Sequence, residues 1–226
     1  MRKPLLATTL LATIAATPAA FAHEAGDIIV RAGAVTVTTH ESTSGVKTSG
    51  LGNLGGKATL NNDTQLGLNF AYMVTDNIGI ELLAATPFKH DVHVKGTGIN
   101  FVDGKLGSLK HLPPTLSAVY YPLDSKSSFQ PYIGAGINYT WFFDEKLSSS
   151  AKNSALAANS FKVKNSWGLA AQVGADYMLT DNLMINGQVR YIDIDTDATL
   201  NTVAGRTKVN VDVKPWVYMV GLGYKF

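Results

Sequence analysis

Apolar residues occupy every second position in six segments of this chain, and this period of two constrains the fold more than any other feature. Successive side chains of a β-strand point to opposite faces, so each segment predicts a strand with one apolar face. The six segments are residues 65–72, 78–83, 133–141, 166–177, 183–191 and 216–226. Two weaker candidates, residues 27–37 and 114–121, bring the predicted number of strands to eight.

The connections between these strands alternate in length. Residues 75–77 and 180–182 are the tripeptide Thr-Asp-Asn, which is typical of a tight turn, and residues 122–130 form a modest link. The remaining four connections are long, at about residues 38–63, 88–112, 142–165 and 195–211. Short turns at one end and long loops at the other predict an all-β fold, an eight-stranded antiparallel up-and-down transmembrane β-barrel.

The composition of the two strand faces favours a membrane barrel over a water-soluble sandwich. The faces opposite the apolar ones carry mostly Gly, Ala, Ser, Asn and Gln, which suit a narrow lumen. Aromatic residues end the apolar faces, as in the interfacial girdles of membrane barrels. They are Tyr72, Tyr139, Trp141, Trp167, Tyr177, Tyr191, Trp216 and Phe226. No apolar run after residue 22 reaches the ~18 residues of a membrane-spanning helix, which leaves a closed barrel as the spanning structure.

The two ends of the chain indicate export to the bacterial outer membrane. Residues 1–22 have a basic start, an uncharged apolar core and a small-x-small ending at Ala20 and Ala22, which predict a signal peptide that is removed. An uncleaved membrane anchor is the alternative, but its apolar core is short and Pro18 interrupts it. Residues 23–226 then form the barrel domain. The terminal Phe226 ends an aromatic-rich strand, the usual signal for the barrel-assembly machinery.

Charge and cysteine content exclude several functions. The chain has 19 Lys and Arg against 17 Asp and Glu, and Arg2 and Lys3 lie in the predicted signal peptide. The exported chain is therefore neutral overall, which argues against nucleic acid as a partner. It has no cysteine, so disulfides and thiolate metal sites are excluded.

Several motifs along the mature chain resemble the OmpW family of small outer-membrane porins, which includes the alkane-uptake protein AlkL. The motifs are residues 23–26, 31–33, 62–68, 75–79, 81–88, 111–116, 131–140, 166–168, 193–196 and 215–217. The resemblance implies an eight-stranded barrel that admits small hydrophobic molecules from outside into a narrow apolar pocket, from which they leave sideways into the membrane. At the position of Arg190 the family commonly has a bulky aromatic residue, so this chain departs from the family there.

Strand parity assigns side chains to the lumen independently of the resemblance. Near the predicted extracellular end the inward positions are apolar and form an expected funnel: Val35, Val37, Leu83, Ala85, Ile192, Ile194, Val213 and Val217. Lower down the inward positions are polar or charged and form an expected belt: Arg31, Asn69, Glu81, Gln172, Asp176, Asn186, Gln188 and Arg190. Apolar solutes would partition into the funnel and be excluded by the belt.

The belt and Leu83 each allow two interpretations. Charges facing a narrow lumen are costly unless paired, so a salt-bridged plug is favoured over an ion or proton path. Arginines beside Glu81 and Asp176 would keep these carboxylates ionised, which makes them poor general acids. Leu83 is the bulky apolar residue on an otherwise small or charged inward face. It either constricts the funnel as a gate or merely fills the barrel.

Other candidate sites carry weaker signals. Asp193, Asp195 and Asp197 share an outward face, where they either bind cations that bridge lipopolysaccharide phosphates or form a solvated strand end, which we favour. His90 and His93 are predicted to be surface histidines in a loop rather than metal ligands. No serine has a recognisable nucleophile context, so we expect neither an enzyme nor a cofactor.

The sequence thus predicts an outer-membrane channel for passive uptake of small hydrophobic solutes, in contact with membrane lipid and lipopolysaccharide. The alternative is a surface receptor or adhesin, of the colicin or phage type, or a structural barrel acting through its extracellular loops without transport.

Overall fold

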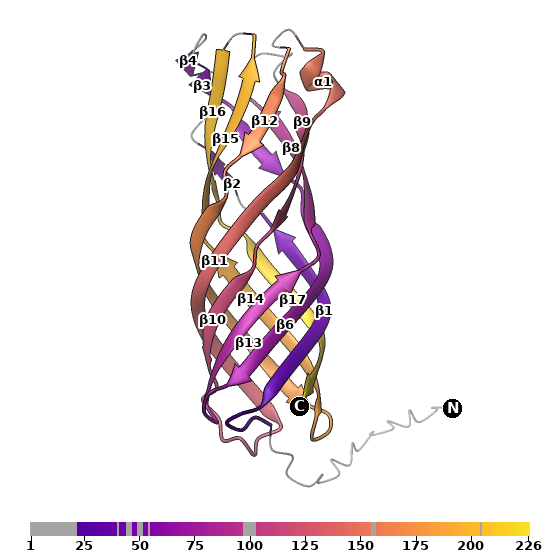
Figure 1. Cartoon of the computed structure of the whole chain (residues 1–226), viewed down its shortest axis with the longest axis vertical. Helices are drawn as coiled ribbons and strands as arrows, with labels where there is room; N and C mark the ends of the chain where they lie inside the picture. Colours follow the sequence, from indigo (N-terminus) through magenta and orange to yellow (C-terminus); the bar gives the residue numbers. More distant parts are fainter. Residues whose placement is uncertain are drawn as a thin grey trace, which may run out of the picture.

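The eight predicted transmembrane strands form one closed barrel in the computed structural model (Figure 1). The structure describes residues 22–39, 41–43, 47–48, 52–53, 55–96, 103–154, 157–203 and 205–226, so the predicted signal peptide, apart from Ala22, lies outside the described residues. The eight strands are β1 (Ile28–Thr38), β6 (Asp63–Met73), β7 (Ile78–Ala85), β10 (Thr115–Tyr120), β11 (Phe129–Leu147), β13 (Ser166–Met178), β14 (Leu183–Ile192) and β17 (Trp216–Lys225).

Closure of the barrel follows from the order of the strands. The order is β10-β7-β6-β1-β17-β14-β13-β11, and β10 pairs with β11 to complete the ring. Every pairing is antiparallel, and the first and last strands meet between Arg31↔Gly223 and Val37↔Val217. The predicted fold class is therefore confirmed. Closure leaves none of the eight ring strands with an unpaired edge, as a lipid environment requires.

Short turns join the strands at the end where the described chain begins and finishes (Figure 1). The repeated Thr-Asp-Asn motif forms the same turn twice. The Ile78 amide donates to the Thr75 hydroxyl at 3.0 Å, and the Leu183 amide donates to the Thr180 hydroxyl at 2.9 Å. Side-chain acceptors of this kind stabilise tight turns locally. The loop asymmetry assigns this end to the periplasm and the opposite end to the cell exterior.

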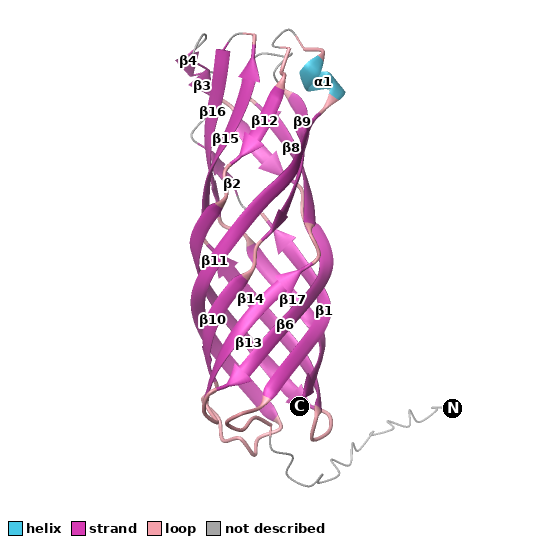
Figure 2. Ribbon diagram, in the orientation of Figure 1, coloured by secondary structure: helices cyan, strands magenta, loops and turns pink. Residues whose placement is uncertain are grey.

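The long extracellular connections consist largely of β-structure, where the sequence predicted loops (Figure 2). Their described residues contain one helical turn, α1 (Ser149–Lys152), and nine short strands. The strands are β2 (Glu41–Thr43), β3 (Lys47–Thr48), β4 (Gly52–Asn53), β5 (Lys57–Leu60), β8 (Phe88–Lys95), β9 (Gly104–Leu112), β12 (Ser160–Val163), β15 (Ile194–Thr202) and β16 (Gly205–Val213). We call these strands, together with the upper part of β11, the extracellular extension, because they continue the barrel wall away from the membrane.

Prolines mark three of the junctions between the barrel and its extension. Pro87 separates β7 from β8, Pro113 and Pro114 separate β9 from β10, and Pro215 separates β16 from β17. Proline has no amide hydrogen to donate to a neighbouring strand, so it interrupts a ladder. The lower ring continues through β11 into β9, β8 and β5, whereas β12, β15, β16, β3 and β4 form a second sheet.

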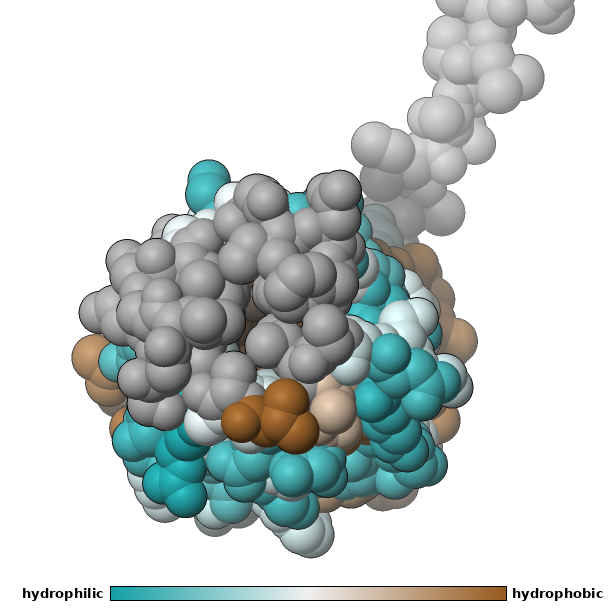
Figure 3. All heavy atoms as spheres, turned by 90° about the horizontal axis from the view of Figure 1, so that it is seen from above, coloured by the Kyte–Doolittle hydropathy of each residue, from teal (hydrophilic) through white to brown (hydrophobic). Residues whose placement is uncertain are grey.

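The outer face of the lower ring is apolar. Large side chains that point away from the lumen are 37% or more exposed, among them Leu66, Phe70, Ile80, Ile137, Trp141, Trp167, Leu169, Val220 and Leu222. Seen from the extracellular end, the described rim is mostly hydrophilic and apolar atoms project beyond it at the sides (Figure 3). Within the described part of the chain, no helix has the length and apolar character needed to cross a membrane.

Candidate functional site in the barrel lumen

The lumen contains three layers of buried side chains. An apolar cluster at the extracellular end, which we call the funnel cluster, comprises Val35, Val37, Leu83, Phe88, Ala170, Ile192, Ile194, Val211, Val213, Val217 and Met219. A polar and charged belt lies in the middle. A second apolar cluster at the periplasmic end, which we call the floor, comprises Ala22, Ile29, Ala71, Met73, Val119, Tyr121, Tyr132, Met178 and Met184.

Arg31 and Asp176 form the lower half of the belt. Arg31 is fully buried, and its Nε and Nη2 atoms donate to the two carboxylate oxygens of Asp176 at 3.0 and 2.5 Å. Its remaining donors reach the Asn69 amide oxygen at 3.1 Å and the Tyr121 hydroxyl at 2.9 Å. Asp176 also accepts from the Asn186 amide at 2.8 Å. This bidentate pair satisfies both charges inside the barrel.

Glu81 and Arg190 form the upper half of the belt. Arg190 Nη2 donates to Glu81 Oε1 at 2.6 Å, and its Nε donates to the Gln172 amide oxygen at 2.6 Å. The Gln172 amide in turn donates to Glu81 Oε1 at 2.9 Å. Arg31 Nη1 lies 3.5 Å from Glu81 Oε2 and so connects the two halves. All four charged side chains are at most 1% exposed, so the belt forms one paired network that fills the cross-section.

The floor was not anticipated from the sequence. Met73, Met178 and Met184 occupy inward positions that parity assigned to a polar face, and Tyr121 and Tyr132 pack against each other with ring centroids 5.1 Å apart. Above the floor, His23 Nε2 lies 3.0 Å from Asp176 Oδ2, so the start of the predicted mature chain contacts the belt. The lumen is therefore filled at two successive levels below the funnel.

The sequence-predicted funnel residues lie together in the structure. Val35, Val37, Leu83, Ile192, Ile194, Val213 and Val217 are buried members of the funnel cluster, and Ala85 packs against it half-buried. Leu83 pairs with Asn69 on β6 and Thr115 on β10, two positions along its strand from Glu81. It therefore lies where the funnel meets the belt. The structure adds Phe88 and, half-buried, Phe142 to the funnel, which strand parity in the predicted loops could not assign.

A cavity of about 30 Å³ opens at the top of the funnel. Its lining is mostly apolar, with Val37, Leu60, Leu109, Phe142, Ile194, Val213 and Pro215, and it also contains Thr39, Thr140, His90 and His111. On the same measure one water needs ~10–15 Å³, so the cavity is small. The funnel at this level is therefore largely filled by its own side chains.

The prediction that His90 is a surface histidine was wrong. His90 is 1% exposed and stacks on His111, with ring centroids 4.9 Å apart, and its Nδ1 lies 2.6 Å from the Asn61 carbonyl oxygen. The reason is that residues 88–95 form strand β8, whose alternation turns His90 inward and leaves His93 partly exposed. Among the described residues, no three His, Asp or Glu side chains lie close enough together to hold a metal ion.

A seam in the barrel wall lies beside the funnel, where β9 gives way to β10. Pro113 and Pro114 interrupt the ladder there, and the Asn138 amide donates to their carbonyl oxygens at 3.0 and 3.1 Å. The same amide lies 3.0 Å from the Thr115 hydroxyl. One buried side chain thus supplements the backbone hydrogen bond of 3.1 Å that the Tyr139 amide donates to the Pro114 carbonyl oxygen.

The outward carboxylates above the membrane have partners of their own. Asn210 donates to Asp195 at 2.9 Å, and Lys164 forms an ion pair with Asp197 at 2.8 Å. Asp193 is exposed on the same face. This arrangement is that of a solvated strand end, and whether these groups bind cations stays a prediction.

Comparison with known proteins agrees with this architecture. The family model described as OmpW matches residues 24–226. Outer membrane protein W of Vibrio cholerae is 42% identical over 226 residues, covering 100% of both chains. Outer membrane protein AlkL of Ectopseudomonas oleovorans is 33% identical, covering 77% of this chain and 74% of that protein. The crystal structure of OprG from Pseudomonas aeruginosa has a TM-score of 0.85 and 52% identity, covering 90% of this chain and 97% of that one.

The fold and its relatives define a small outer-membrane β-barrel of a Gram-negative bacterium with a filled lumen and an apolar extracellular mouth. Its localisation is accordingly the outer membrane. The chain belongs to the OmpW family.

Proposed function

We propose that this protein is a channel for the passive uptake of small hydrophobic molecules across the outer membrane. The observation that carries the proposal is the funnel cluster: apolar side chains line the inside of a membrane barrel whose outside is already apolar. A barrel that served only as a scaffold could fill its mouth with polar residues. Apolar solutes gain roughly 25 cal/mol for each Å² of surface that they bury in such a mouth.

The layers below the funnel define which solutes can pass. The belt presents paired charges across the lumen, and the floor closes it again. A solute that has entered the funnel would therefore leave through the wall rather than through the floor. We place this exit at the seam at Pro113 and Pro114, because neither proline has an amide hydrogen to pair with a neighbouring strand. The family resemblance implies the same sideways exit, and the proposal involves no catalytic step.

Uptake by intact cells tests the proposal. Cells with and without the protein would be given a medium-chain alkane and, separately, a sugar of similar size. Faster alkane entry with unchanged sugar entry supports the channel. Faster entry of the sugar would mean a water-filled pore and would contradict the lumen assignment. No change for either solute would favour a surface receptor that acts through the extracellular extension.

Leu83→Lys tests the role of the funnel at its narrow end. We expect alkane uptake to fall about tenfold, the change that a penalty of ~1.4 kcal/mol produces, because the new ammonium makes the base of the funnel polar. Val203→Lys is the matched control, since Val203 is 74% exposed on the extension and lies outside the funnel. Unchanged uptake in folded Leu83→Lys barrels would remove the gate assignment from Leu83.

A further inference from the structure

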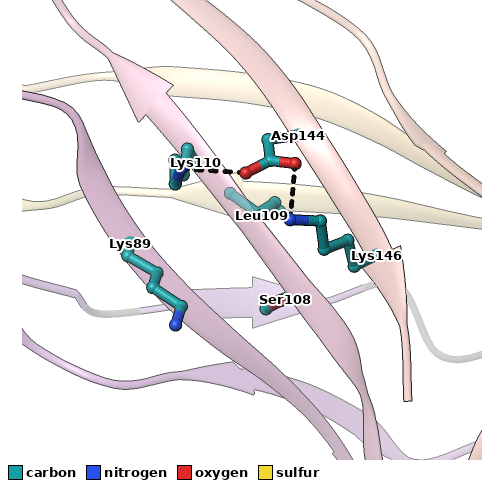
Figure 4. Close-up of a pocket in the computed structure, with 6 residues that line it drawn as sticks. All are labelled: Lys89, Ser108, Leu109, Lys110, Asp144 and Lys146. Carbon is teal, nitrogen blue, oxygen red and sulfur yellow. Dashed lines mark ion pairs between the residues drawn. The ribbon is translucent and has the colours of Figure 1, made fainter. Parts of the chain in front are cut away.

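A cluster of lysines on the outside of the extracellular extension plays no part in the uptake proposal. Lys89 on β8 and Lys110 on β9 occupy directly paired positions of neighbouring strands. Lys146 lies on β11, and Asp144 of the same strand forms ion pairs of 2.9 Å with both Lys110 and Lys146 (Figure 4). Two ammonium groups thus hold one carboxylate, and Lys89 lines the same hollow without contacting it, so the cluster has a net positive charge.

The local backbone is shaped to bring these groups together. The pairing of β11 with β9 shifts between Phe143 and Lys146, so residues 144 and 145 form a bulge. Asp144 at this bulge has a φ of 53°, in the left-handed region that a non-glycine residue rarely adopts. Bulges redirect side chains at particular positions of a strand. Here the bulge aims the carboxylate outward between two lysines.

Three other lysines of the extension each have a carboxylate partner of their own. Lys105 pairs with Asp91 at 2.6 Å, Lys164 with Asp197 at 2.8 Å and Lys214 with Asp212 at 3.0 Å. By contrast, Lys89 forms no ion pair with any described residue. Lys110, which has the same charge, occupies the directly opposite position on β9. Like charges at paired strand positions are destabilising. A bound anion would remove this repulsion.

The lysine cluster also borders a hollow that is large enough for a small anion and lies close to the aromatic girdle. A hollow of about 140 Å³ lies among Lys89, Ser108, Leu109, Lys110, Asp144 and Lys146, several times the ~10–15 Å³ that one water needs. Two register steps below Lys110, Leu112 pairs with the exposed Trp141, whose ring lies 5.2 Å from that of Phe143. The lysines therefore stand directly above the aromatic girdle, at the level of lipid headgroups.

We propose that Lys89, Lys110 and Lys146 form a binding site for a phosphate group of lipopolysaccharide in the outer leaflet. The acyl chains of that lipid would lie against the apolar wall below Trp141, while the phosphate occupies the hollow. Lysine is a common phosphate ligand that acts as a point charge. Asp144 keeps two of the ammonium groups in place, and its pKa is lowered to about 2 by hydrogen bonds from Lys110 and Lys146, so it stays ionised.

Binding of purified lipid A to the detergent-solubilised barrel, followed by native mass spectrometry, tests the site. The probes are lipid A with both phosphates and the same lipid A after phosphate removal. The variant is Lys89→Gln/Lys110→Gln/Lys146→Gln. The matched control is Lys105→Gln/Lys164→Gln/Lys214→Gln, which removes the same charge from one-to-one ion pairs of the extension. A difference in gel mobility between unheated and heated protein shows that each barrel is folded.

We expect the variant to bind phosphorylated lipid A about tenfold or more weakly, because lysines at a membrane surface contribute additively to anionic lipid binding. The control protein should bind phosphorylated lipid A as strongly as the unmodified protein does. Dephosphorylated lipid A should bind the variant and the unmodified protein equally. Equal loss in the control, or equal loss for the dephosphorylated probe, would overturn the proposal. Competition by inorganic phosphate at concentrations similar to lipid A would also overturn it, in favour of a site for free phosphate.

Discussion

Each carboxylate of the lumen belt has more than one hydrogen-bonding partner. We expect the substitution of Glu81 to destabilise the barrel most. Glu81 accepts hydrogen bonds from Arg190 and Gln172 and lies within ion-pair distance of Arg31. Glu81→Gln would leave one of two buried arginine charges uncompensated. We expect a loss of about 3–5 kcal/mol in the free energy of unfolding, the range measured when one partner of a buried ion pair is removed.

Urea unfolding of the barrel in lipid vesicles would measure this loss. Asp212→Asn is the matched control, because Asp212 forms an exposed ion pair with Lys214 and such pairs contribute about 0–1 kcal/mol. Equal destabilisation by the two substitutions would mean that the belt is solvated and does not act as a paired plug.

His111 gives the barrel a dependence of stability on pH. It is buried one register step above the Trp141 row, among Phe88, His90 and Phe142. Burial, and secondly the nearby His90, lower the pKa of His111 to about 3, while Asp63 acts in the opposite direction. An unfolded histidine titrates near 6.5. Between these values the unfolded chain takes up a proton that the folded barrel does not, so stability falls as the pH falls.

The substitution His111→Phe should remove this contribution. Between pH 7.5 and pH 5 the unmodified protein should lose roughly 2 kcal/mol more unfolding free energy than the variant, since each pH unit below 6.5 contributes about 1.4 kcal/mol. Urea midpoints at the two pH values measure the difference. Identical pH dependence in the two proteins would show that His111 is protonated, or solvated, in the folded barrel.

At the scale of strands, closure of the barrel depends on a close approach between β1 and β17. Gly33 pairs directly with Gly221, and a Cβ atom built at Gly33 would lie 2.2 Å from the Val220 carbonyl oxygen. Gly33→Val should therefore reduce the folded fraction severalfold, because two backbones cannot separate without breaking the closing ladder. Gly187→Val is the control, since a Cβ there meets no atom within 4 Å.

The folded fraction can be read from gel mobility before and after heating. A Gly33→Val barrel that folds as completely as the Gly187→Val barrel would contradict the argument and imply that the ladder can widen locally.

The strands were predictable from the sequence to different degrees. Segments such as 133–141 alternate strongly because one face meets lipid and the other a small lumen, so their number, order and direction followed from the sequence. Strands β8, β9, β15 and β16 meet water outside, and their polar residues give a pattern close to that of a loop. In β8 only the inward residues Phe88, His90, Val92 and Val94 show the alternation of a strand.

The inward orientation of the site residues was predictable, because odd or even position along a strand decides to which face a side chain points. Arg31, Glu81, Gln172, Asp176 and Arg190 are buried in the lumen together, and the partners within the belt depend on strand stagger, which residue patterns do not specify. The floor could not be anticipated because methionine and tyrosine at its positions suit either face of a membrane strand. The roles of these residues in uptake stay predictions.

At the scale of the whole molecule, the proposed activities use opposite surfaces of one wall. The funnel lies inside the barrel, on the inward faces of strands such as β1, β7, β14 and β17, whereas the lysine cluster lies outside β8, β9 and β11. His90 and Lys89 are successive residues of β8 that point to the two surfaces. Alternation along a single strand thus separates solute contacts from lipid contacts, and variants in one should leave the other intact.

The belt and the floor together have a consequence for the cell that makes this barrel. A general porin admits water and salts in proportion to its copy number, so its abundance is a liability whenever toxic hydrophilic compounds are outside. Two filled layers below the mouth remove that link. With the proposed uptake function, bacteria could accumulate this barrel to high density for growth on scarce apolar nutrients, while the envelope still excludes polar antibiotics and detergents.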